Sequence, residues 1–217
     1  MAIKCVVFDM AGTTVDDTGN IVGYSMAQAF REVDFIFSPT QVAKYMGMSK
    51  PNTIRNLLEE KVDVVYRAFV ENMKAYYAEY AEEITGATKV FAALRERGIK
   101  VALNTGFPRE IVTVILEKLK WDGWKVDAVV CSDEVVRGRP YPDMILRIRS
   151  DLGLNMSRTP STEIMKVGDT EVDIYEGGRA GCGMVVGTSY GSAGAAKLIE
   201  AGADHIISSL EEVLDLV

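Results

Sequence analysis

Histidine is almost absent from this 217-residue chain, and cysteine is scarce. The single histidine, His205, leaves too little material for a Ser-His-Asp triad, a histidine-rich zinc site or a histidine general base. Cys5, Cys131 and Cys182 are odd in number, widely spaced and set in apolar stretches, which indicates buried thiols in a reducing compartment. Chemistry in this protein must therefore use carboxylates, lysine, backbone dipoles or a hard metal ion.

Positive charge and long apolar runs are also lacking. The chain has 24 Lys and Arg against 31 Asp and Glu, a net charge of −7, whereas nucleic acids and anionic membranes select clustered Lys and Arg. No run approaches the roughly 20 apolar residues of a membrane span, and the apolar run before Asp9 is too short for a signal peptide. We therefore expect a cytoplasmic protein with no nucleic-acid or membrane partner.

Short β-rich apolar runs recur along the chain ahead of turn residues. They cover residues 3–8, 100–103, 128–131, 164–167 and 183–186, and helical patterns lie between the later ones, at 89–97 and 109–120. Alternation of strand and helix is typical of an α/β protein with a parallel sheet. We predict a Rossmann-like, doubly wound parallel sheet as the core.

One segment, from about residue 15 to residue 85, breaks this alternation and is nearly all helical. Helical patterns cover 24–33, 53–60 and 64–83, and a capping box at 38–41 has proline at the first helical position. We predict a core domain of residues 1–14 and 86–217 and a small helical cap domain of residues 15–85, inserted after the first strand. Ligands of open α/β sheets bind beyond the carboxyl ends of the strands, so the cap would cover that crevice.

Polar clusters follow three of the predicted strands. Asp9 follows the first strand, Thr105 and Gly106 follow the second, and Asp169 follows the fourth. Because the carboxyl ends of parallel strands meet, Asp9 and Asp169 would face each other without histidine or cysteine, an oxygen-only site that suits Mg²⁺. Each aspartate taken alone is equally a turn former or a helix cap.

The same edge offers donors to a phosphoryl group. Gly12 and Gly106 would let backbone N–H groups approach it closely, and Thr105 and Arg139 would add donors to its oxygens. Arg139 could instead be a solvated loop residue, and Asp173 could simply begin a helix, where negative charge is favoured.

The segment Asp9-Met-Ala11-Gly-Thr-Thr-Val resembles the first motif of the haloacid dehalogenase superfamily in its phosphonatase (phosphonoacetaldehyde hydrolase) form, whereas most members have Asp-x-Asp. The resemblance extends to about residue 190. It implies that Asp9 is a nucleophile that forms an aspartyl-phosphate, that Thr105 binds the phosphoryl group and that Arg139 replaces the usual lysine. It also implies a Mg²⁺ site of Asp9, the Ala11 carbonyl and Asp169, supported by Asp173.

Ala11 cannot supply the general acid that the usual second aspartate gives to an alkoxide leaving group. Cleavage of a carbon–phosphorus bond instead leaves a carbanion whose charge must be delocalised, and a lysine imine can delocalise it. The segment Met46-Gly-Met-Ser-Lys50 resembles the phosphonatase cap segment whose lysine forms a Schiff base, and Met46 would contact substrate there. Lys50 precedes Pro51 and a helical pattern, so a helix N-terminus would disfavour its ammonium form; the alternative is a solvated surface lysine.

Several residues depart from the phosphonatase pattern. Thr53 stands where the family has a histidine, Met10 replaces a tryptophan, and the family cysteine is missing near residues 19 and 20. We expect Thr53 to contact substrate without acting as a base. The expected activity is Mg²⁺-dependent C–P cleavage of a small phosphonate aldehyde. The alternatives are a phosphatase of a small phosphorylated metabolite and a catalytically silent phosphate-binding module, and a homodimer through the cap is possible.

Overall fold

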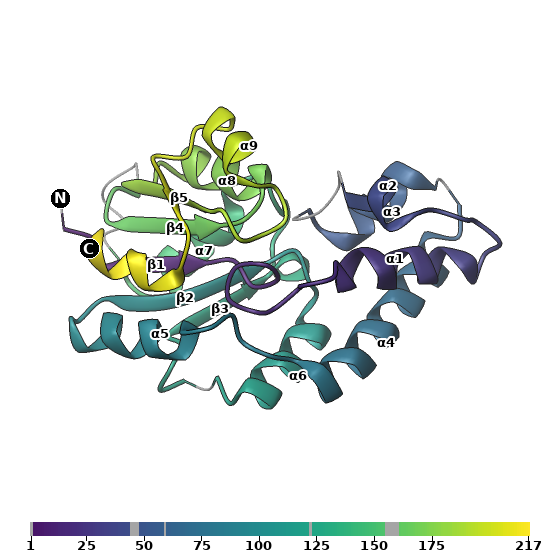
Figure 1. Cartoon of the computed structure of the whole chain (residues 1–217), viewed down its shortest axis with the longest axis horizontal. Coiled ribbons are helices and arrows are strands. Elements are labelled where there is room, and N and C mark those ends of the chain that lie inside the picture. Colours follow the sequence, from purple (N-terminus) through teal and green to yellow (C-terminus); the bar gives the residue numbers. More distant parts are fainter. Residues whose placement is uncertain (1, 44–47, 59, 122, 155–160) are drawn as a thin grey trace.

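The core of the protein is a six-stranded, fully parallel sheet in the order β3-β2-β1-β4-β5-β6 (Figure 1). The computed structural model describes residues 2–43, 48–58, 60–121, 123–154 and 161–217. The strands are β1 (Cys5–Phe8), β2 (Lys100–Thr105), β3 (Ala128–Cys131), β4 (Ile164–Gly168), β5 (Met184–Thr188) and β6 (His205–Ile207). The predicted doubly wound α/β fold is confirmed, and the predicted strands agree with β1 to β5 to within two residues at each end.

Helices cover both faces of the sheet, which is why its strands are nearly continuous apolar runs. Alternate residues of β1 point to opposite faces: Val6 and Phe8 join one hydrophobic cluster, and Cys5 and Val7 join another. Helices α5 (Ala87–Glu96) and α6 (Arg109–Leu119) contribute to the first cluster, with the 3₁₀ segment η2 (Leu210–Asp215). The second contains α7 (Asp143–Asp151) and the end of α8 (Glu171–Ala180), while α9 (Ala195–Glu200) packs near β5 and β6.

Four helices between β1 and α5 form a separate layer beside the sheet (Figure 1). They are α1 (Ile21–Arg31), α2 (Pro39–Ala43), α3 (Lys50–Leu57) and α4 (Val62–Tyr80). The long helix α4 packs on α1 and on α6 of the core, and it buries an apolar stripe of Val65, Phe69, Val70, Met73 and Tyr77. These helices, called the cap below, lie beyond the carboxyl end of β1.

Local capping explains where the cap helices begin. Helix α1 starts three residues earlier than predicted, because Asn20 adopts a left-handed conformation and its side chain accepts from the Gly23 N–H. The predicted capping box is present: the Gln41 side chain accepts from the Ser38 N–H at 2.8 Å, and the Ser38 hydroxyl accepts from the Gln41 N–H at 3.3 Å. Helix α3 begins at Lys50 itself, as expected from the proline that follows it.

The three cysteines are free thiols. Cys5 and Cys131 are buried, as predicted, whereas Cys182 is only half-buried at the end of α8. Among the helices of the described residues, none is both long and apolar enough to cross a membrane.

The aromatic contact between Phe91 and Trp121 joins α5 to the loop after α6, with ring centroids 5.0 Å apart, and Phe91 also lies 5.3 Å from Phe8 of β1. Phe91→Ala should lower the free energy of unfolding by about 3–5 kcal/mol, because it leaves a cavity at the centre of this cluster. Ile199→Ala, on the exposed side of α9, should change it by less than about 0.5 kcal/mol. Urea unfolding followed by far-UV circular dichroism measures both; equal effects would contradict the assigned core.

Candidate active site

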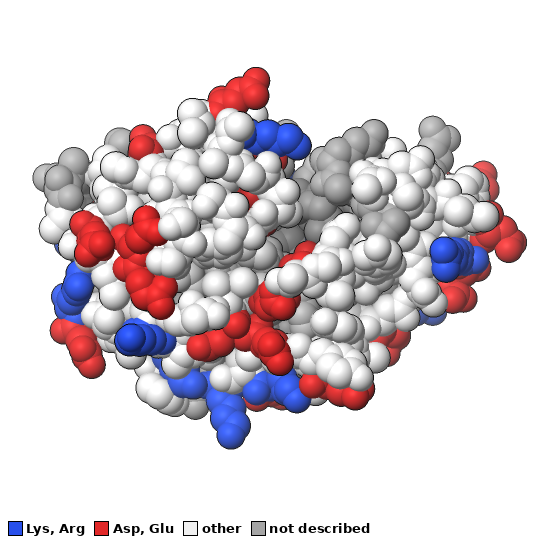
Figure 2. Space-filling view, viewed as in Figure 1, with Lys and Arg blue, Asp and Glu red and all other residues white. Residues whose placement is uncertain are grey.

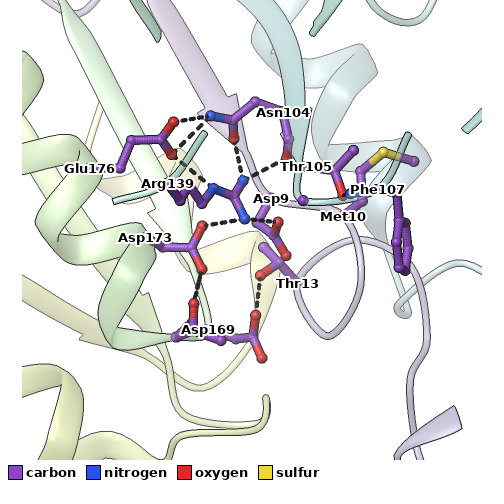
Figure 3. Close-up of polar contacts among 12 residues, drawn as sticks. Asp9, Met10, Thr13, Asn104, Thr105, Phe107, Arg139, Asp169, Asp173 and Glu176 are labelled. Atoms are coloured by element: carbon purple, nitrogen blue, oxygen red, sulfur yellow. Dashed lines mark hydrogen bonds and ion pairs between the residues drawn. The ribbon is translucent and has the colours of Figure 1, made fainter. Parts of the chain in front are cut away.

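The carboxyl ends of β1, β2 and β4 bring the predicted polar residues together. Strand β1 lies between β2 and β4, so Asp9 after β1 is flanked by Thr105 at the end of β2 and by Asp169 after β4 (Figure 3). Arg139, from the loop before α7, enters the same cluster, and Asp173 reaches it from the first turn of α8. All five side chains are buried, so the polar cluster predicted from strand ends forms a single site.

Arg139 lies at the centre of this cluster and is 2% exposed. Its Nη1 lies 2.5 Å from an Asp9 carboxylate oxygen and 3.1 Å from Asp173, and its Nε donates to Glu176 at 2.9 Å. Its Nη2 donates to the backbone carbonyl and to the side-chain oxygen of Asn104, at 2.7 and 2.6 Å. Burial disfavours the guanidinium charge, but these carboxylates outweigh burial and raise the pKa of Arg139. The solvated loop arginine considered above is therefore excluded.

Lys166 and Glu176 belong to the same network but were not predicted from the sequence. Lys166 of β4 is fully buried, with its Nζ 3.0 Å from Asp173, 2.7 Å from Asn104 Oδ1 and 3.7 Å from Glu176. Two features of the sequence could have pointed to these residues. A lysine inside a buried strand needs an ionic partner, and Glu176 lies three residues after Asp173 on the same face of a helix.

The two carboxylates nearest the cavity, Asp9 and Asp169, are held in an electrostatically unfavourable arrangement. Burial, and then the charge of Asp9, raise the pKa of Asp169 to about 7, and burial also raises the pKa of Asp9 against the opposing charge of Arg139. Asp169 is fixed by donors from the Ser192 backbone and hydroxyl at 2.8 and 2.7 Å, and from the Thr13 hydroxyl at 3.2 Å.

This donor set fits a divalent cation. Asp9, Asp169 and Asp173 offer oxygen atoms within 4.8 Å of one another, and all donors are carboxylates, which Mg²⁺ prefers. Asp173 is turned away from the cavity: one oxygen faces Arg139 and Lys166, and the other accepts from Thr170. A cation here would therefore contact Asp9 and Asp169, with Asp173 behind them.

Gly12 makes room for this arrangement. A Cβ atom at this position would lie 2.6 Å from an oxygen of Asp169, and the φ of +86° also favours glycine. However, the Gly12 N–H donates to the Val15 carbonyl at 2.8 Å, so the amide expected to meet a phosphoryl group is already engaged. Gly106 does line the cavity, and no acceptor for its N–H is found among the described residues.

Lys50 reaches the site from the cap. A small cavity of about 20 Å³, room for about one water molecule, is bounded by Lys50 on the cap side and by Asp9, Ala11 and Thr105 on the sheet side. Lys50 is 3% exposed, and its Nζ lies 5.3 Å from the centroid of the Phe107 ring. Burial lowers the pKa of Lys50 to about 8 against the opposing charge of Asp9. The solvated surface lysine is therefore excluded.

One other predicted substrate contact, Thr53, lies away from this cavity. Thr53 is buried on α3, its hydroxyl donates to the Ser49 carbonyl at 3.3 Å, and it does not line the cavity between Lys50 and Asp9. Met46 lies outside the described residues. Thr105 does line the cavity, and its hydroxyl oxygen accepts from the Phe107 N–H at 3.1 Å, which leaves the hydroxyl proton for a ligand.

A wider cavity of about 820 Å³ lies between the cap and the core, next to the small one. Both are lined by Asp17, Thr170 and Ser192, so they meet at these residues. The wider cavity is also lined by Asp16 and Glu171, and Figure 2 shows acidic side chains along the boundary between the two parts of the molecule. Asp17, which no motif pointed to, therefore lies between the wider cavity and Lys50.

Comparison with known proteins gives one consistent family. Residues 3–181 match the family model of haloacid dehalogenase-like hydrolases. Phosphonoacetaldehyde hydrolase of Bacillus cereus is 32% identical over 210 residues, covering 87% of this chain and 78% of that protein, and the Bacillus anthracis protein of the same name gives the same values.

Solved structures agree with these relatives. The crystal structure of a phosphonoacetaldehyde hydrolase-like protein from Oleispira antarctica has a TM-score of 0.87 at 26% identity, over 100% of this chain and 91% of that one. A hydrolase from Pseudomonas syringae shares the fold, with a TM-score of 0.86 at 22% identity over 99% of both chains. The chain thus belongs to the haloacid dehalogenase-like hydrolases, and within them it is phosphonoacetaldehyde hydrolase-like.

Proposed function

We propose that this hydrolase cleaves the carbon–phosphorus bond of a small phosphonate aldehyde, phosphonoacetaldehyde or a close relative, with Mg²⁺ as cofactor. One observation carries the proposal: the amine of Lys50 and the carboxylate of Asp9 line the same small cavity, one from the cap and one from the sheet. A phosphatase needs only the second of these groups. The similarity to curated phosphonoacetaldehyde hydrolases supports the same substrate class.

Lys50 prepares the substrate by forming an imine with its aldehyde carbon. The lowered pKa of Lys50 provides the neutral amine that this attack requires. The protonated imine then accepts the electron pair of the C–P bond when that bond breaks, so the leaving carbon needs no general acid. This explains why Ala11 suffices next to the cavity, where a phosphatase of this fold would need an acid.

Asp9 is the nucleophile that takes the phosphoryl group. Its carboxylate is held by Arg139, which would transfer its donors to the phosphoryl oxygens together with Thr105 and the Gly106 N–H. A Mg²⁺ ion held by Asp9, Asp169 and the Ala11 carbonyl would neutralise charge on those oxygens. Water then hydrolyses the aspartyl-phosphate and restores the carboxylate.

The cap controls access to both groups. A cavity of about 20 Å³ holds a water molecule but not a phosphonate aldehyde, so the cap must move away from the sheet for substrate to enter. Closure would then bring Lys50 to the aldehyde carbon and exclude bulk water from the imine.

Lys50→Arg should abolish turnover of phosphonoacetaldehyde, because a guanidinium cannot form the imine. Borohydride reduction in the presence of this substrate should attach its carbon skeleton to Lys50 in the wild-type protein, as read by peptide mass spectrometry. Lys89→Arg, which changes an exposed lysine of α5, is the matched control and should retain both activity and adduct. Normal turnover by Lys50→Arg, or no adduct on Lys50 in the wild-type protein, would contradict the imine mechanism.

The pH dependence of trapping follows from the pKa of Lys50. Since the pKa is lowered to about 8, the neutral amine dominates above that pH, and about a tenth is neutral at pH 7, against less than about a thousandth for an ordinary lysine. The rate of cyanoborohydride trapping should therefore rise between pH 6 and 8 and level off above about 8.5. A rate still rising steeply at pH 10 would show that Lys50 is unperturbed.

Removal of Mg²⁺ should abolish activity and expose the repulsion between Asp9 and Asp169. A carboxyl group whose pKa is higher in the folded than in the unfolded protein contributes stability that is lost as the pH rises through its folded pKa. For Asp169 that pKa is about 7. At pH 8 without Mg²⁺, Asp169→Asn should therefore be more stable than wild type by about 1–3 kcal/mol, and Mg²⁺ should stabilise only the wild type. Urea unfolding with and without MgCl₂ tests this, with Asp151→Asn as a surface control; equal Mg²⁺ stabilisation of wild type and Asp169→Asn would place the metal elsewhere.

A further inference from the structure

Imine formation at Lys50 needs a group that moves protons, and the residues already discussed do not supply one. The amine must lose a proton before it attacks the aldehyde, and the resulting hydroxyl must gain one before it leaves as water. Ala11 has no acidic group, and the hydroxyl of Thr53 is directed to the Ser49 carbonyl. Asp9 and Asp169 are committed to the phosphoryl group and the cation.

Asp17 occupies the position that this step requires. It lies in the loop between β1 and α1 and lines the small cavity together with Lys50. One of its carboxylate oxygens accepts from the Val22 N–H at 3.0 Å, in the first turn of α1. The Ile21 N–H also donates to this carboxylate, and both donors belong to the start of α1, so they fix the carboxylate at the wall of the cavity that it shares with Lys50.

The pKa values of Asp17 and Lys50 are shifted toward each other, which suits the exchange of a proton between them. Burial raises the pKa of Asp17 to about 6, against the opposing Val22 amide and the charge of Lys50, and Asp17 in turn favours the charged form of Lys50. The other titratable groups that face Asp17 are Asp16 beside it and the phenols of Tyr76 and Tyr77 from α4.

Asp17 and Lys50 make no direct ion pair among the described contacts, but they share a cavity with room for about one water molecule. A bridging water, or the hydroxyl formed from the substrate carbonyl, would therefore lie between the carboxylate and the amine. Asp17 also borders the wider cavity, through which the released water can leave.

We propose that Asp17 is the proton-transfer residue for imine formation at Lys50. This rests on the proposed function and deepens it. The Asp17 carboxylate takes one proton from the Lys50 ammonium, directly or through water. The neutral amine then forms the C–N bond, and its second proton passes to the former carbonyl oxygen. Protonated Asp17 gives its proton to that hydroxyl, the C–O bond breaks, and water leaves as the protonated imine forms. The carboxylate is regenerated, so protons and charge balance.

A merely electrostatic role for Asp17 predicts the opposite effect of its removal. Because the Asp17 charge favours the Lys50 ammonium, Asp17→Asn lowers the pKa of Lys50 further and increases the neutral amine at pH 7. Trapping would then become faster. If Asp17 transfers protons, Asp17→Asn makes trapping slower even though more of the amine is neutral. The direction of the change therefore separates the two roles.

The test is the rate of cyanoborohydride trapping of phosphonoacetaldehyde on Lys50 at pH 7, measured by mass spectrometry. We expect Asp17→Asn to trap about 100-fold more slowly than wild type. Asparagine can still accept from the Val22 N–H, which preserves the start of α1. Asp16→Asn is the matched control: Asp16 lines only the wider cavity and accepts from Thr18, and its loss should leave the rate within about twofold.

Asp17→Glu and Asp17→Gln, which are equal in size, give a second comparison if Asp17→Asn does not fold. The Glu variant should trap at least about tenfold faster than the Gln variant. Trapping by Asp17→Asn as fast as wild type or faster, or equal rates for Glu and Gln, would overturn the role of Asp17. Absence of any adduct on Lys50 in the wild-type protein would instead overturn the proposed function.

Discussion

The site depends on an imbalance of buried charge at the carboxyl edge of the sheet. Asp9, Asp169, Asp173 and Glu176 place four carboxylates there, and Arg139 and Lys166 provide two cations. Buried charges are tolerated only when they are paired. Lys166 pairs with Asp173 and Glu176, and Arg139 pairs with these two and with Asp9, but neither cation pairs with Asp169 among the described contacts. Asp169 is left facing Asp9, with its pKa raised. The fold thus holds a deficit of positive charge between Asp9 and Asp169, where the proposed metal ion would bind.

The cap contributes Lys50 to the site, and burial of this amine lowers its pKa. Helix α3 begins at Lys50, and packing of the cap against the sheet encloses that amine with Phe107 and Asp9. Desolvation in such a place disfavours the ammonium ion. The packing that places the amine in the same cavity as Asp9 therefore also lowers its pKa, so the position and the lowered pKa of Lys50 have one cause.

The sequence predicted the parts of the molecule whose signals are local. Buried parallel strands are short apolar runs that can be recognised in the sequence, and parallel strands place their carboxyl ends together. The grouping of Asp9, Thr105 and Asp169 therefore followed from their positions at the ends of predicted strands. The position of Lys50 at a helix start followed from Pro51. Contacts that depend on three-dimensional packing did not follow: Lys166 and Glu176 pair across two elements, and the Gly12 amide is engaged within its own loop. Asp17 belongs to no sequence motif that was recognised, and its place in the site could be inferred only from the two adjoining cavities that it lines.

The central claim is that Ala11 and Lys50 together specify cleavage of a carbon–phosphorus bond rather than an ester bond. It is tested most directly by kcat/KM for phosphonoacetaldehyde against glycolaldehyde phosphate, which retains the aldehyde but inserts an ester oxygen before the phosphorus. We predict a preference of about 1,000-fold for the phosphonate, because the ester's departing oxygen finds no acid in place of Ala11. Equal values, or faster turnover of the ester, would contradict the account and identify a phosphatase.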